Sequence, residues 1–164
     1  MTIFVKNKHT LQIDEFKFRC CIGKNGSTIK KNEGDKKTPR GTFEIENLYF
    51  RKDRKEKPST LLRCIEIKKD MGWCNDKRFS KKYNKLFKIE KKIKHEKLKR
   101  KDYKYDLLIT IKYNFKNPIS GLGSCIFIHL TKDYKPTAGC VALKEKDFLI
   151  MLKLIKKRSK IKIF

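Results

Sequence analysis

A repeated period-two pattern of apolar residues is the feature that most restricts the fold of this chain. It is clearest between Tyr105 and Tyr113, where Leu107, Ile109 and Ile111 alternate with other residues. Such alternation places one set of side chains on one face of a β-strand. Shorter segments of similar character are expected as strands at residues 2–6, 10–14, 16–22, 42–50, 62–67, 124–130 and 160–164. The chain is therefore predicted to be mainly β.

One helix is expected near the C-terminus, over residues 145–157. Phe148, Met151, Leu152 and Ile155 follow the i, i+3, i+4, i+7 spacing of an amphipathic helix. Acidic residues in its first turn and basic residues near its end complement the helix dipole. This helix is predicted to pack against the strands.

Two segments carry no clear period. Residues 71–94 hold the only Trp, Trp73, among many lysines, and are expected to be irregular with a short helix possible. Trp73 itself is expected in the core. Residues 90–101 are nearly all charged, which favours a solvated helix or loop. With 164 residues and no internal repeat, the whole of 1–164 is predicted to be a single domain.

The chain is strongly basic, with a formal net charge of +26 and 38% charged residues. A lysine-coated surface attracts polyanions without specificity. A nucleic-acid-binding module is thus an alternative function, but the basic residues are scattered and no known nucleic-acid motif appears. No apolar stretch of about 18 residues predicts a transmembrane segment. The first sixteen residues lack the basic head and apolar run of a signal peptide.

Six cysteines and three histidines could carry chemistry. No cysteines form a CxxC pair, so no metal site is expected. Cys140 follows Gly139 in a turn, where successive N–H groups can converge as an oxyanion hole requires. A thiol needs a base near neutral pH, and His129 lies eleven residues upstream at the end of an expected strand. From spacing alone, a histidine on a strand is more often an ordinary core or surface residue than a catalytic base.

Several motifs together resemble the L,D-transpeptidase catalytic domain family. Residues 126–129 (IFIH) followed by 136–143 (PTAGCVAL) are similar to its histidine and cysteine motif. Residues 33–43 (EGDKKTPRGTF) are similar to its Thr-Pro-x-Gly-x-Phe element. Residues 70–76 and the Tyr-Asn pairs at 83–84 and 113–114 resemble a branch of short, single-domain members. The resemblance covers nearly the whole chain and implies a β-sandwich or barrel with one C-terminal packed helix.

The resemblance also implies a site. Cys140 would be the nucleophile, His129 its base, and the backbone N–H groups of Ala138, Gly139 and Cys140 the oxyanion hole. A backbone carbonyl is often the group that orients the histidine. Candidates for binding an anionic stem peptide of peptidoglycan are Arg40, Asn114 and Lys135. No metal or organic cofactor is implied, and the expected location is the cell envelope or periplasm.

Two departures from the family pattern are visible. Many members have Arg or Asn two residues after the cysteine, where this chain has Ala142. The loop from histidine to cysteine is also shorter than in many members. The implied reaction is L,D-transpeptidation in peptidoglycan crosslinking and cell-shape maintenance, through a thioester. The alternatives are an L,D-carboxypeptidase with water as acceptor, and a sortase-like enzyme, although no Arg follows Cys140 until Arg158.

Overall fold

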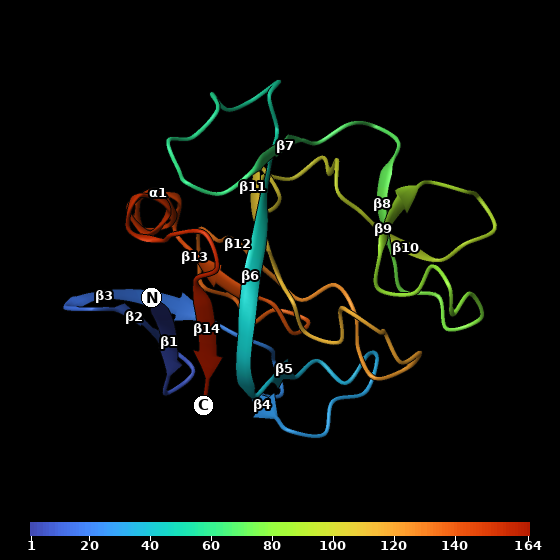
Figure 1. Cartoon of the computed structure of the whole chain (residues 1–164), viewed down its shortest axis with the longest axis horizontal. Coiled ribbons are helices and arrows are strands. Elements are labelled where there is room, and N and C mark those ends of the chain that lie inside the picture. Colours follow the sequence, from blue (N-terminus) through green and yellow to red (C-terminus); the bar gives the residue numbers. More distant parts are fainter.

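The main sheet of the molecule closes on itself. A computed structural model describes residues 1–164. Nine strands form one sheet in the order β11-β12-β13-β3-β2-β1-β14-β6-β7, and an additional β6–β11 pairing closes eight of them into a barrel (Figure 1). Their bounds are β1 (Thr2–Lys6), β2 (Thr10–Ile13), β3 (Phe16–Cys21), β6 (Gly41–Phe50), β7 (Cys64–Glu66), β11 (Leu107–Ile111), β12 (Phe127–Leu130), β13 (Val141–Leu143) and β14 (Lys160–Ile163). The predicted mainly β class is confirmed.

The last strand of the chain occupies an interior position in this sheet. β14 pairs in parallel with β1, in the register Thr2↔Lys160, and antiparallel with β6 on its other side, in the register Ile161↔Phe43. Its residues alternate between exposed and buried, and those of β1 and β2 alternate between half-buried and buried. The period-two pattern of the sequence therefore identified these strands because one of their faces meets solvent.

A core of 25 buried residues fills the barrel and continues beneath the helix. Helix α1 (Glu145–Leu154) contributes Phe148, Met151 and Leu152 to it. The helix ends three residues earlier than predicted, because Ile155 is extended with ψ 150° and the next residues turn into β14. Ile155 is still fully buried, so its apolar side chain fits the helical spacing although it lies beyond the last helical residue. No helix in the structure has the length and apolarity of a membrane-crossing segment.

A second, three-stranded sheet lies beside the barrel, on the right in Figure 1. It comprises β8 (Met71–Cys74), β9 (Leu86–Lys88) and β10 (His95–Lys97), in the order β10-β8-β9. Most of residues 71–94 are irregular, as expected, but strands β8 and β9 were not predicted. Residues 90–101 are mainly loop, as expected, but they include β10, and Leu98 is fully buried. Strands of three or four residues are too short to show a period among so many lysines.

Trp73 and Asn84 join this small sheet to the barrel. Trp73 is buried in a cluster of eight residues between the two sheets, as predicted. The side-chain oxygen of Asn84 accepts hydrogen bonds from the Trp73 indole (2.9 Å) and the Cys125 N–H (3.1 Å). Its amide nitrogen donates to the Tyr113 and Asn114 carbonyls at 3.0 and 2.7 Å. One buried side chain thus fixes three separate segments.

Strand β12 separates the two clusters. Ile128 and Leu130 face the barrel core, whereas Phe127 contacts the Trp73 cluster. The two faces of this strand therefore belong to different apolar clusters. The strand begins at Phe127 rather than residue 124, because Cys125 has a positive φ of 55°. Tyr105, expected on the same face as Leu107, instead precedes β11 and joins the Trp73 cluster.

Candidate active site

The turn from Thr137 to Cys140 is held by the hydroxyl of Thr137. This hydroxyl donates to the Cys140 carbonyl (2.6 Å) and accepts from the Gly139 N–H (3.1 Å). The backbone of Thr137 is bonded to the segment after β3, through Ile22 and Lys24 at 2.9 Å each. The Thr137 hydroxyl and the backbone after β3 therefore fix the turn that leads to Cys140 and β13.

Gly139 is required in this turn by its conformation. Its φ is +145°, and an added Cβ would lie 2.9 Å from the Lys37 carbonyl oxygen and 3.4 Å from Ile126. The residue therefore makes room for the backbone of the chain itself. Glycine is the residue that accepts this combination of positive φ and close backbone approach.

The parallel pairing of β12 with β13 brings His129 and Cys140 to the same face of the sheet. His129 is in register with Ala142, and Cys140 lies two residues before Ala142, so both side chains point the same way. The two residues are 6% and 7% exposed, and both line one cleft of about 580 Å³. Ala138 lines the same cleft. The sheet register thus explains how residues eleven positions apart share a site.

His129 is oriented by a backbone carbonyl. Its Nδ1 lies 2.9 Å from the Leu130 carbonyl oxygen, which can only accept, so this nitrogen carries the hydrogen. The Nε2 atom is then the one able to take a proton. Burial lowers the pKa of His129 to about 4, so the ring is neutral near pH 7. A neutral imidazole with a fixed tautomer is the form that a general base requires.

The thiol of Cys140 is protonated in this state. Burial raises its pKa to about 12, although the N–H of Phe127, Lys31 and Arg100 act in the opposite direction. The thiol donates to the Cys125 carbonyl oxygen at 3.2 Å, and no hydrogen bond joins it to His129. A cysteine–histidine pair of the kind that the sequence suggests predicts a thiol–imidazole hydrogen bond and a sulfur open to substrate. The structure instead holds the two groups neutral and separately bonded.

Two of the three predicted oxyanion donors are free of protein partners. The N–H groups of Ala138 and Cys140 meet no acceptor in the chain, whereas that of Gly139 is bonded to Thr137. Preorganised donors of this kind stabilise negative charge on a substrate oxygen. The turn can therefore offer two backbone donors without rearrangement.

The predicted substrate-binding residues separate into two groups. Lys135 lines the cleft at its rim, where its ammonium is 3.1 Å from Asp133. Arg40 lies outside the lining, exposed between β5 (Thr38–Pro39) and β6. Asn114 is also outside, and its side chain bonds the backbone of Ile119 and Gly123. With a φ of 47°, Asn114 forms a loop rather than a binding surface.

Sequence reasoning missed most of the charged groups that line the cleft, and two of them, Lys31 and Arg100, are held by ion pairs. Lys31 is a buried lysine whose partner is Asp35, and Arg100 is bonded to both Glu96 and Asp102. Neither could be singled out among 44 Lys and Arg residues. The Arg100 guanidinium also stacks over Tyr105, with its Cζ atom 4.9 Å from the centre of the Tyr105 ring.

No other hollow combines these groups. A larger one of about 710 Å³, between β6 and β7, contains Cys64 but no histidine. All six cysteines are free thiols, and no three His, Cys, Asp or Glu side chains are grouped to hold a metal ion. The cleft around Cys140 is therefore the candidate active site.

The barrel and its cysteine–histidine cleft are those of a candidate cysteine enzyme domain. The chain belongs to the L,D-transpeptidase catalytic domain (YkuD) family, whose model matches residues 1–163. The family is generally associated with the cell envelope.

Comparison with solved structures and curated proteins adds evidence on the fold alone. The structure is similar to that of Bdellovibrio bacteriovorus Bd1075, with a TM-score of 0.50 and 18% identity. The match covers 99% of this chain and 47% of that one, so this chain spans about half the length of that protein. The search of curated proteins gave no match.

Proposed function

We propose that this protein is a cysteine-dependent L,D-transpeptidase that remodels peptidoglycan crosslinks in the cell envelope, with residues 1–164 as one catalytic domain. The observation that carries the proposal is the shared cleft. In it, Cys140 and His129 lie on one sheet face beside the free N–H groups of Ala138 and Cys140. Acyl transfer needs these three parts: a nucleophile, a base and an oxyanion site.

Acylation begins with proton transfer from the Cys140 thiol to Nε2 of His129. The sulfur forms a bond to the donor peptide carbonyl carbon, and the oxygen becomes an oxyanion near the free N–H groups. Collapse of this intermediate breaks the C–N bond, and the leaving D-alanine amine takes the proton from Nε2. A thioester on Cys140 is left. Because burial holds the thiol protonated at rest, proton transfer has to accompany substrate binding.

Deacylation reverses the proton path. The side-chain amine of a second stem peptide gives a proton to Nε2 and attacks the thioester carbonyl. The C–S bond breaks and the sulfur takes the proton back. Water in place of the amine would make the protein an L,D-carboxypeptidase, which is the second candidate. Which acceptor reacts depends on the shape of the cleft and on how far it excludes water.

Mass spectrometry of the protein after incubation with tetrapeptide fragments of peptidoglycan tests the proposal. We expect a mass increase on Cys140 alone, and release of D-alanine. Cys125→Ala, which leaves the proposed nucleophile in place, should still be acylated, whereas Cys140→Ala should not. Label on Cys125 in the wild-type protein would refute the assignment. Crosslinked dimers indicate transpeptidation, and tripeptides alone indicate the carboxypeptidase.

Binding to intact peptidoglycan is a separate matter from chemistry. The net charge of +26 and the scattered lysines support non-specific attraction to anionic polymers. We propose that this attraction aids association only.

A further inference from the structure

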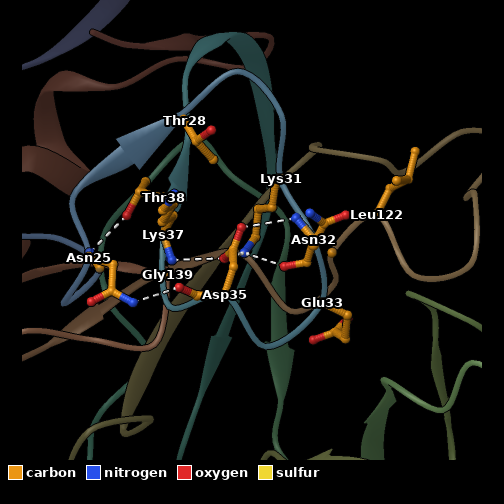
Figure 2. A network of polar contacts seen from close by, with 12 residues as sticks. Asn25, Thr28, Lys31, Asn32, Glu33, Asp35, Lys37, Thr38, Leu122 and Gly139 are labelled. Atoms are coloured by element: carbon orange, nitrogen blue, oxygen red, sulfur yellow. Dashed lines mark hydrogen bonds and ion pairs between the residues drawn. The ribbon is translucent and has the colours of Figure 1, made fainter.

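Lys31 is an unusual lysine, because its side chain is only 3% exposed. Its ammonium lies 2.6 Å from Asp35, which also accepts the N–H groups of Asn32 (2.9 Å) and Lys37 (2.8 Å). Figure 2 shows Asp35 at the centre of these contacts, with Gly139 close by. Burial acts to raise the pKa of Asp35, but these hydrogen bonds outweigh it and lower that pKa. The carboxylate is therefore a charged, fixed anchor for the ammonium.

Two glycines make room for the Lys31 side chain. A Cβ on Gly123 would lie 2.8–3.0 Å from the Lys31 methylene carbons, and one on Gly139 would lie 3.6 Å from its ammonium nitrogen. The methylene chain of Lys31 thus passes over Gly123, and its ammonium lies beside the turn that precedes Cys140. The only other acceptor of the ammonium is the Asn32 carbonyl, at a long 3.4 Å. Of its three N–H bonds, one is free to face the cleft.

Other cations of the cleft are placed differently, and two of them, Lys36 and Lys104, are exposed to solvent. Arg100 is neutralised by two carboxylates, Glu96 and Asp102, at 2.8 and 2.7 Å. Lys135 is 84% exposed on its side chain, so solvent screens it. Lys31 is thus the buried cation with a single carboxylate partner, beside the turn that carries the sulfur.

We propose that Lys31, held by Asp35, is the cation that stabilises negative charge at Cys140, first on the sulfur and then on the substrate oxyanion. This rests on Cys140 being the nucleophile, as proposed above. A fixed charge is worth most where water is excluded, and Cys140 is such a site. Since Gly139 gives its N–H to Thr137, the ammonium also supplies a third donor to an oxyanion site with two free backbone donors.

The pH dependence of Cys140 alkylation by iodoacetamide, followed by peptide mass spectrometry, tests this role without any substrate. In Lys31→Met we expect the apparent pKa of alkylation to rise by about 1, so that the rate at pH 8 falls about tenfold. In Asp35→Asn the cation loses its neutralising partner, so the same pKa should fall. Lys30→Met, which removes an exposed neighbouring charge, should follow the wild type.

The opposite signs separate an electrostatic role from a structural one. Both variants break the ion pair, so a merely structural pair predicts the same direction of change in each, and that result would overturn the proposal. Thermal melting first checks that each variant is folded. If Lys31→Met fails to fold, the near-isosteric Asp35→Asn decides alone: an unchanged or higher pKa overturns the proposal.

The outcome is also distinct from that of the proposed function. Acylation of wild-type Cys140 with unaltered alkylation profiles in both variants would keep the transpeptidase and exclude Lys31. Shifted profiles without any acylation by peptidoglycan fragments would keep the charge pairing and exclude the substrate.

Discussion

Replacement of Gly139 by alanine should damage stability and chemistry together. The added Cβ would lie 2.9 Å from the Lys37 carbonyl oxygen, which is backbone and cannot rotate away. The φ of +145° is also strained for any residue with a side chain. The turn must therefore shift, and with it the Ala138 and Cys140 N–H groups that it presents.

The size of the effect follows from two contributions. Backbone strain at a positive φ costs about 1–2 kcal/mol, and relief of the backbone clash costs about 1–3 kcal/mol more. At roughly 2–4 °C per kcal/mol for a chain of this size, the melting temperature should fall by about 4–20 °C. A displacement of about 1 Å at the reacting atoms slows catalysis about a hundredfold, so acylation of Cys140 should slow by a similar factor.

Gly26→Ala is the matched control. Gly26 also has a positive φ, +78°, but an added Cβ would meet only the flexible end of Lys8, at 3.4 Å. It should show the strain contribution alone, about 1–2 kcal/mol, with acylation unaffected. Differential scanning calorimetry and the rate of Cys140 acylation measure both quantities. Equal melting temperatures for the two variants would refute the reasoning, because the clash with Lys37 would then contribute nothing.

Two further predictions concern pH and the link between the sheets. Folding lowers the pKa of His129 from 6.5 to about 4, so the free energy of unfolding is fully present above pH 6.5 and falls toward pH 4. When the pH is lowered from 7 to 4, the free energy of unfolding of His129→Gln, measured by urea titration, should fall by about 3 kcal/mol less than that of the wild type. Asn84→Ala leaves the Trp73 indole N–H unpaired and should cost about 3 kcal/mol or more by the same assay. Asn75→Ala, whose side-chain oxygen has no partner, should cost clearly less.

The sequence predicted most of the barrel strands, including β14, which has one exposed face, and β11, which is buried on both faces. Strands β2 and β14 carry a period because polar and apolar residues alternate along them, and helix α1 carries one because its apolar residues recur at helical spacing. The three-stranded sheet has no such period, since its strands are three or four residues long and Gly72 in β8 is covered by Phe87 and His95. Its buried anchors, such as Leu98, are isolated among lysines.

The candidate site was predictable only where a motif carried it. The order of His129 and Cys140 matched a family pattern, and the β12–β13 register accounts for their common face. Lys31 has no local signature, because its burial depends on Gly123 and Gly139, which are 92 and 108 positions away along the chain. Arg40 and Asn114 lie outside the cleft because a motif fixes neighbours in sequence, not the direction of each side chain.

The interior position of β14 has a consequence for how the protein folds. β14 provides the partner for one edge of both β1 and β6, and its register joins Thr2 to Lys160. The barrel therefore cannot close during synthesis until its last strand has left the ribosome. Pairing between segments so distant in sequence slows folding, and the open edges of β1 and β6 are prone to aggregation meanwhile. The lysines that flank β14 and alternate along it then also serve as charges that oppose association of unfinished chains.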